Sequence, residues 1–285
     1  MSRIAIMQGR LAIPEAGRFQ SFPRQQWHEE FARASQADLD AIEWIYDEFG
    51  EDVNPIGSNA GLEELHRLSK QHDVAVVSVC ADYFMDRPIV KAGSRELIEI
   101  VDRLEWLVRR CRTAGIERMV IPFVDQSQIR TEEDAALAIE VLMSALPSAK
   151  ANSVELHLET SLAPAPFAAF LERLPSPWIK VNYDSGNSSS LGSDPKEEFA
   201  AYGSRIGSVH VKDRIRGGGT VPLGTGDADL PTVFRELARV GYTGDYVLQV
   251  ARGQNGDEVN WARHNREQVL ALLSQASEQA ARRQA

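Results

Sequence analysis

Short apolar segments rich in β-branched residues recur along the whole chain, and each is followed by turn residues and a segment with helical spacing. This alternation is typical of repeated strand–helix units whose strands run parallel in one sheet. In the segments between the strands, apolar residues return at every third or fourth position, as in a helix that packs one face on a sheet. The weakest helical pattern lies near residues 195–203. The predicted strands are residues 4–8, 41–46, 74–80, 118–123, 153–159, 179–184, 207–212 and 246–250.

The number of these units, eight, favours one of the two common parallel architectures. A doubly wound sheet usually has a glycine-rich first turn, and the segment after the first predicted strand, GRLAIP at 9–14, does not have that pattern. Eight units without an intervening linker predict a single closed (β/α)₈ TIM barrel. We expect the barrel to occupy residues 1–276 and the polar, alanine-rich segment 277–285 to fray.

Composition and charge narrow the class of protein. A hydrophobic content of 43% and a charged content of 25% are ordinary for a soluble globular protein. No stretch approaches the roughly 18 apolar residues of a membrane span, and the first residues do not form a signal peptide, so we expect a cytoplasmic protein with no membrane partner. The two cysteines, Cys80 and Cys111, are expected to be buried free thiols. A net charge of −10 argues against a nucleic-acid partner, although a local cluster of basic residues can still bind a small anion.

Polar residues lie at or near the C-terminal ends of most of the predicted strands. In a parallel barrel the catalytic groups come from these ends. Glu159 and Asp184 end the fifth and sixth segments, and His210 and Gln249 lie in the seventh and eighth. Two carboxylates, an imidazole and an amide oxygen on consecutive strands suit Mn²⁺, Mg²⁺ or Co²⁺, which prefer hard oxygen ligands. The earlier strand ends carry Gln8, Glu43, Asp82 and Asp125.

The motifs around these four positions are ELHLET at 155–160, VNYDSGN at 181–187, HVKDR at 210–214, PLGTGD at 222–227 and GYTG at 241–244. Together they resemble the sugar phosphate isomerase/epimerase family of xylose-isomerase-like TIM barrels, which includes the ketose 3-epimerases and is related to apurinic endonucleases. The resemblance extends over nearly the whole chain. It implies one divalent metal ion and a catalytic base at Glu159. Mn²⁺ is the expected ion, and Mg²⁺, Co²⁺ and Zn²⁺ are the alternatives. The implied metal ligands are Glu159, Asp184, His210 and Gln249.

The chain departs from the family pattern at two positions. Asn187 stands where the family commonly has a histidine, and Gln249 stands where it commonly has a second glutamate. An amide oxygen can still bind a metal ion, but an amide cannot accept a substrate proton at neutral pH. These two departures therefore affect the two-base chemistry of the family more than they affect metal binding. Glu43 or Asp125 could supply a substitute acid.

A basic, glycine-rich segment follows the seventh predicted strand. Lys212, Arg214 and Arg216 precede three glycines at 217–219, and such a loop can cradle a phosphate or, alternatively, simply turn the chain at the surface. By resemblance, Arg216 matches a substrate-binding arginine of the ketose epimerases. Arg252, just beyond the eighth strand, could bind the same anion. Asn187 and Glu43 complete the set of predicted substrate contacts.

The predicted function is a metal-dependent isomerase or epimerase of a sugar, with or without a phosphate group, which acts through a cis-enediolate with Glu159 as base. Because Gln249 is neutral, a single-base aldose–ketose isomerisation is slightly favoured over epimerisation at C3. A dehydratase or lyase acting on a β-hydroxy carbonyl compound would begin with the same proton abstraction. A non-catalytic sugar-binding barrel is a further alternative, and a nuclease would need more histidines than the 6 present. Assembly into a homo-oligomer stays open.

Overall fold

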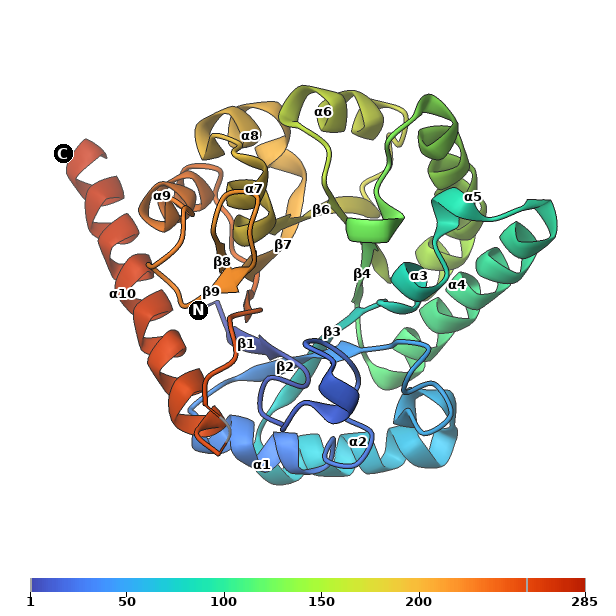
Figure 1. The fold of residues 1–285 in the computed structure, drawn as a ribbon, viewed down its shortest axis with the longest axis horizontal. Helices are drawn as coiled ribbons and strands as arrows, with labels where there is room; N and C mark the ends of the chain where they lie inside the picture. Colours follow the sequence, from blue (N-terminus) through green and yellow to red (C-terminus); the bar gives the residue numbers. More distant parts are fainter. Residues whose placement is uncertain (1, 255, 285) are drawn as a thin grey trace.

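The structure, a computed structural model, describes residues 2–254 and 256–284 and closes the eight predicted strands into one parallel barrel (Figure 1). The order around the barrel is β1-β10-β7-β6-β5-β4-β3-β2, and every neighbouring pair is parallel. The predicted TIM barrel is therefore confirmed. Its strands are β1 (Ile4–Met7), β2 (Ala41–Ile45), β3 (Ala75–Cys80), β4 (Arg118–Phe123), β5 (Glu155–Thr160), β6 (Ile179–Asp184), β7 (Ile206–Val211) and β10 (Tyr246–Leu248).

Helices surround the barrel as an outer ring (Figure 1). The weakest predicted pattern, near residues 195–203, forms a helix as expected. None of the helices among the described residues is long and apolar enough to cross a membrane. The helices are α1 (Glu29–Gln36), α2 (Asn59–His72), α3 (Tyr83–Asp86), α4 (Ser94–Ala114), α5 (Glu132–Asn152), α6 (Pro164–Glu172), α7 (Ser185–Leu191), α8 (Pro195–Tyr202), α9 (Leu230–Arg239) and α10 (Glu258–Gln284).

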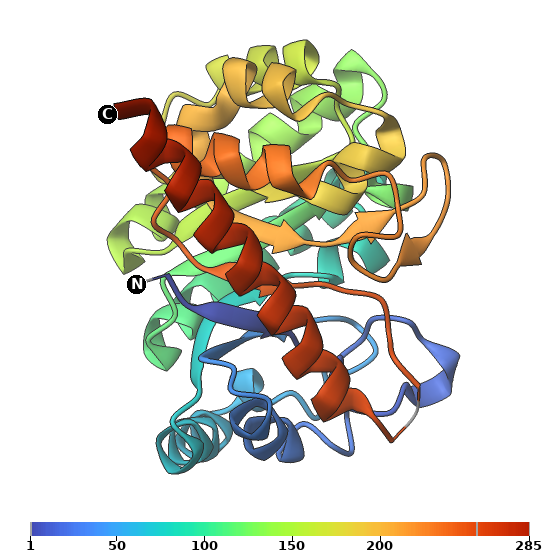
Figure 2. The same ribbon diagram turned by 90° about the vertical axis from the view of Figure 1, so that its left-hand side faces the viewer.

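The C-terminal helix α10 runs diagonally across the outside of the barrel (Figure 2). It continues through the segment that we expected to fray, as far as Gln284, because glutamate, glutamine, alanine and arginine are good helix formers. Ala276 is buried where this segment begins, and the hydroxyl of Ser277 donates a hydrogen bond to the carbonyl of Leu273. Fraying of the last turns in solution stays a prediction, and Ala285 lies outside the described residues.

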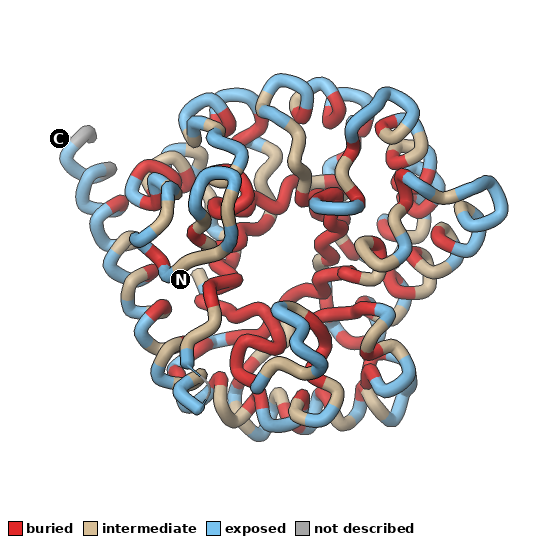
Figure 3. Tube along the Cα trace, in the orientation of Figure 1, coloured by how far each residue is buried: buried red, intermediate tan, exposed pale blue. Residues whose placement is uncertain are grey.

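Buried residues gather in the ring of strands and on the inner faces of the helices (Figure 3). The predicted stripe on α2 is one example, because Leu62, Leu65 and Leu68 are all buried. Cys80 and Cys111 are buried free thiols, as predicted. Polar side chains are also buried among the strands, and they are the ones that build the candidate site: Glu43, Ser78, His157, Glu159, Asn182, Asp184, Ser208 and His210.

Several short elements were not predicted, and two of them lie beside the candidate site. The first is α7, whose sequence SGNSSSL has no apolar periodicity. It begins because Asp184 Oδ1 accepts hydrogen bonds from the backbone N–H groups of Gly186 and Asn187, both at 2.8 Å, and so caps the helix. The second is a short antiparallel hairpin of β8 (Asp213–Arg214) and β9 (Thr220–Val221), which contains the basic, glycine-rich segment.

Candidate metal centre and active site

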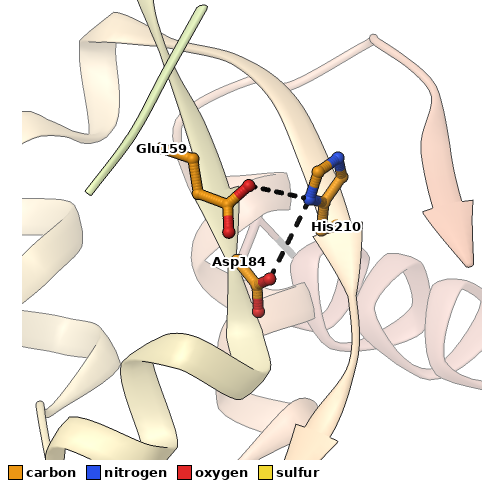
Figure 4. A group of neighbouring side chains, drawn as sticks. All are labelled: Glu159, Asp184 and His210. Atoms are coloured by element: carbon orange, nitrogen blue, oxygen red, sulfur yellow. Dashed lines mark ion pairs between the residues drawn. The ribbon is translucent and has the colours of Figure 1, made fainter. Parts of the chain in front are cut away.

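Glu159 at the end of β5, Asp184 at the end of β6 and His210 in β7 converge at the C-terminal end of the barrel (Figure 4). One ligand atom from each lies within 4.8 Å of the others. His210 Nδ1 is 3.3 Å from Glu159 Oε2 and 3.9 Å from Asp184 Oδ2. Because all three residues are buried on consecutive strands, the backbone of the barrel fixes their separation.

The neighbours of His210 fix the orientation of its ring. Nε2 donates to Glu43 Oε1 at 2.6 Å, and the other oxygen of Glu43 accepts a bond from Ser78 Oγ at 2.6 Å. Nδ1 is therefore the ring nitrogen on the side of Glu159 and Asp184, and Asn182 Nδ2 lies 3.0 Å from it. Without a proton, Nδ1 can bind a cation that it shares with the two carboxylates.

The charge of this buried cluster also fits a divalent ion. Glu43, Glu159 and Asp184 contribute three carboxylates, whereas the one ammonium group nearby is that of Lys212, whose Nζ lies 3.5 Å from Asp184 Oδ2. Buried charge must be compensated, because transfer out of water is costly for an unpaired ion. Carboxylate oxygens with one imidazole nitrogen are a donor set for Mn²⁺, Mg²⁺ or Zn²⁺, so the residues present fit the metal ion that the sequence predicts.

The same electrostatics shift the pKa of two of these residues, Glu159 and His210. Burial raises the pKa of Glu159, and the like charge of Asp184 raises it further, against the opposing effects of His210 and Lys212. For His210, burial lowers the pKa, but Glu43 and Glu159 outweigh this effect and hold the pKa well above its ordinary value. Each shift shows that the cluster favours added positive charge.

Gln249 joins the cluster through Lys212. Its Oε1 accepts a hydrogen bond from Lys212 Nζ at 3.1 Å, and its Nε2 donates to Gln20 Oε1 at 3.0 Å, so the amide oxygen is turned toward the side of Asp184. Gly186 makes room for the lysine, because a Cβ at this position would lie 2.5 Å from Lys212 Cγ. A glycine at the start of α7 is thus needed for the position of Lys212.

A cavity of about 510 Å³ opens above this cluster. Its size is that of a typical small-molecule site. Five of the predicted site residues line it, namely Glu159, Asn187, Lys212, Arg214 and Gln249. Arg214 donates from Nη1 to Asn187 Oδ1 at 2.9 Å, and Asn187 Nδ2 donates to Glu159 Oε1. A chain of hydrogen bonds therefore holds the carboxylate of Glu159 at the cavity wall.

Three other predicted substrate contacts lie outside the lining of this cavity. Arg216 is exposed beyond β8, and its guanidinium lies over Gly192. Arg252 donates to the backbone carbonyls of the loop that follows β1. Glu43 is completely buried behind His210.

The physical reason for the position of Arg216 is the hairpin: β8 ends at Arg214, so Arg216 falls in the turn and points away. Arg214, which was also predicted as a substrate contact, is in the strand and lines the cavity. Glu43 contacts His210, a predicted ligand, which is the geometry of a residue that orients an imidazole.

Two groups of residues that shape the site were not among the predicted site residues. Asp213 is buried and accepts hydrogen bonds from the N–H groups of Gly224, Gly226 and Ala228, which ties the PLGTGD loop to β8. A Cβ at Gly226 would lie 2.3 Å from Asp213 Oδ1, so this glycine permits the contact. The alternation of glycines in the motif was the available signal.

The second group consists of Gln20, Cys80 and Asp82, which all line the cavity. Asp82 Oδ2 accepts from Gln20 Nε2 at 2.8 Å, and its Oδ1 accepts from Cys80 Sγ at 3.1 Å. Burial raises the pKa of Asp82 to about 7. Asp82 was noted as a polar strand end, but nothing in the sequence marked Gln20 as its partner, because that contact joins two loops far apart in the chain.

Comparisons with known proteins agree with this arrangement. The sequence profile of the family described as xylose isomerase-like TIM barrel matches residues 31–272. A putative L-ribulose-5-phosphate 3-epimerase of Escherichia coli strain K12 is 23% identical over 263 residues, which cover 87% of this chain and 88% of the relative. Relatives from Salmonella paratyphi A and Haemophilus influenzae have names of the same kind, and such sugar epimerases are isomerases.

Solved structures show the same fold. The structure of an L-ribulose 3-epimerase superposes with a TM-score of 0.76 at 20% identity, covering 100% of this chain and 99% of the other. A xylose isomerase-like TIM barrel protein from Mycobacterium smegmatis in complex with magnesium has a TM-score of 0.71 at 18% identity, covering 96% and 97%. Since the family profile spans most of the barrel, the chain belongs to the xylose isomerase-like TIM barrel family.

Proposed function

We propose that the protein is a divalent-metal-dependent epimerase or isomerase of a sugar, with or without a phosphate group, which acts through a cis-enediolate. The observation that carries this proposal is the position of Glu159, which belongs both to the three-residue donor set and to the lining of the cavity. One carboxylate can therefore lie beside the metal ion and beside a bound substrate. The relationship to sugar epimerases supports the same chemistry.

Glu159 is the proposed base, which removes the proton from the carbon next to the substrate carbonyl. Burial raises its pKa, and a carboxylate with a raised pKa is a stronger base near neutral pH. Asn187, held by Arg214, keeps one oxygen of Glu159 in a hydrogen bond and so orients the carboxylate. The amide of Asn187 therefore donates a hydrogen bond to Glu159 and does not itself gain or lose a proton.

Glu159, Asp184 and His210, with the amide oxygen of Gln249, would hold the ion. When bound, a divalent ion supplies stabilisation of the negative charge that develops on adjacent substrate oxygens. Mn²⁺ is the first candidate, with Mg²⁺, Co²⁺ and Zn²⁺ as alternatives, and a structural relative was solved with magnesium. His210 is oriented for this role by Glu43.

The substrate class follows from the cavity wall. Lys212 and Arg214 provide positive charge at its edge, and Gln20, Asn187 and Gln249 provide amide groups suited to hydroxyl recognition. We therefore propose a small carbohydrate as the ligand, without a nucleic-acid partner, and a cytoplasmic enzyme. The relative named for L-ribulose 5-phosphate and the one named for L-ribulose supply a matched pair of test substrates that differ only in the phosphate.

The proposal is tested by deuterium exchange. Protein stripped of metal and reloaded with Mn²⁺ is incubated in D₂O with each of the two sugars, and the recovered sugar is analysed by mass spectrometry and NMR. We expect deuterium next to the carbonyl, dependence on the metal, and a loss of about 10²- to 10⁴-fold in the Glu159→Gln variant at full metal content. Binding of both sugars without any exchange would instead support a non-catalytic sugar-binding barrel.

A further inference from the structure

Epimerisation needs two groups that exchange protons with the substrate, one on each face of the reacting carbon. Gln249 is an amide and cannot fill either role. The acidic residues that line the cavity besides Glu159 are Asp47, Asp82, Asp86 and Asp125. These four carboxylates differ in their hydrogen bonds and in their exposure to solvent.

Three of these four carboxylates either accept hydrogen bonds from backbone N–H groups or are exposed to solvent. Both oxygens of Asp47 accept backbone N–H groups, those of Phe22 and Gly50, so this carboxylate holds a loop. Asp86 accepts the N–H of Glu48. Asp125 is exposed, which removes the substitute acid that the sequence suggested from the buried part of the cavity.

Asp82 differs from all three. It is 8% exposed, it follows β3, and both its hydrogen bonds come from neutral side chains of the cavity wall, Gln20 Nε2 and Cys80 Sγ. Among the described residues no cationic side chain donates to it. A buried carboxyl group without a cationic partner is costly for stability, and such a group in a cavity is characteristic of a functional site.

The two acids reach the cavity from different strands. Glu159 ends β5 and Asp82 follows β3, with β4 between them in the barrel. Gln20 links Asp82 to the metal side of the cavity, because Gln20 Oε1 accepts from Gln249 Nε2 at 3.0 Å while its own Nε2 donates to Asp82. Both carboxyl groups therefore line the cavity in which a sugar would bind.

We propose that Asp82 is the second proton-transfer residue, and that with Glu159 it makes the protein a two-base ketose 3-epimerase. This inference rests on the proposed function. In one direction the carboxylate of Glu159 takes the proton from C3, which leaves the enediolate. The carboxylic acid of Asp82 then gives a proton to C3 from the other face. Solvent takes the proton from Glu159 and returns one to Asp82, so that the cycle closes without oxidation or reduction.

The protonation of Asp82 agrees with this role. Burial is the largest cause that raises its pKa, and the negative charges of Asp47 and Glu159 also raise it. The hydrogen bonds from Gln20 and Cys80 lower it, and the net pKa is about 7. Arg10, on the loop after β1, is the basic side chain whose charge interacts with Asp82. A carboxyl group near pH 7 can serve as an acid in one direction and as a base in the other.

The test measures exchange from each epimer separately. L-ribulose 5-phosphate and L-ribulose, each with its 3-epimer, are incubated in D₂O with the Mn²⁺-loaded wild type and with the Asp82→Asn variant. We expect interconversion to fall about 10²- to 10⁴-fold in Asp82→Asn, while C3 exchange persists from the epimer that Glu159 deprotonates. Glu159→Gln should retain exchange from the opposite epimer only.

Two further variants guard against indirect effects. Glu63→Gln, which changes an exposed acid on the outer helix α2, should leave both rates unchanged. Asp82→Glu retains an acid and should interconvert the epimers faster than Asp82→Asn, and equal rates in the two would overturn the proposal. So would wild-type interconversion in Asp82→Asn, or equal loss of exchange from both epimers. If the wild type itself exchanges neither sugar, the proposed function fails, and the inference falls with it.

Discussion

The buried pair of Glu43 and His210 offers the most quantitative prediction. Both side chains are 0% exposed, Glu43 Oε1 lies 2.6 Å from His210 Nε2, and Glu43 Oε2 accepts from Ser78 at 2.6 Å. Burial raises the pKa of Glu43, but His210 outweighs this effect and lowers it. The carboxylate therefore stays charged and fixes the imidazole with Nδ1 toward the other ligands.

Replacing Glu43 should weaken metal binding and stability to different extents in two variants. Glu43→Gln keeps an acceptor for Nε2–H but removes the charge, so we expect the Kd for Mn²⁺ to rise about 10-fold. Glu43→Ala also frees the ring, so we expect a rise of up to about 100-fold, the usual range for partners of ligating histidines. Glu43→Ala should in addition lower the free energy of unfolding by about 3–5 kcal/mol, because it breaks a buried pair.

Calorimetric titration of metal-free protein with Mn²⁺ and chemical denaturation measure the two quantities independently of any substrate. Asp125→Asn is the matched control, since it removes an exposed carboxylate at the same end of the barrel. An unchanged Kd in both Glu43 variants, or the same rise in Asp125→Asn, would refute the reasoning.

Three other predictions concern the walls of the site and the barrel. Arg214→Ala should raise KM about 10- to 150-fold, which corresponds to about 1.5–3 kcal/mol for lost charged hydrogen bonds, while Arg216→Ala should leave KM close to that of the wild type; the reverse order in steady-state kinetics would contradict the assigned positions. Gly186→Ala should lower the unfolding free energy by about 1–3 kcal/mol, because its Cβ would lie 2.5 Å from Lys212 Cγ, and an unchanged Tm would argue against this close packing. Burial raises the pKa of Glu155, but hydrogen bonds from a buried histidine and a lysine outweigh it and lower the pKa to about 2. The stabilisation is therefore complete above the ordinary pKa of about 4.5 and disappears as the pH falls toward 2, so Glu155→Gln should cost about 1 kcal/mol at pH 7 and nothing near pH 2 in urea denaturation.

The strands and the convergence of three ligands could be predicted because they depend on local patterns. A β-branched segment that ends in a carboxylate is visible in one stretch of sequence, and barrel topology then brings neighbouring strand ends together, as it does for Glu159, Asp184 and His210. The family motifs indicated the class of chemistry. These parts of the site needed no knowledge of contacts between distant segments.

The remaining site residues depend on such contacts. Arg216 lies in the turn of a hairpin whose two strands are each only two residues long. Strands this short have no hydrophobic pattern in the sequence. Glu43 was expected to contact substrate, but it lies in the middle of β2, two residues before the strand ends, and is buried against His210. Gln20 reaches Asp82 from another loop, a contact with a separation of 62 residues. Sequence periodicity does not predict any of these three positions.

The metal centre itself is tested most directly by anomalous diffraction from crystals soaked in Mn²⁺, recorded on both sides of the manganese absorption edge. The account predicts one strong peak bounded by the carboxylates of Glu159 and Asp184 and by Nδ1 of His210, with the amide oxygen of Gln249 turned toward it. The peak should be absent in Asp184→Ala crystals soaked in the same way. A peak at another place, or a wild-type map without one, would contradict the proposed centre.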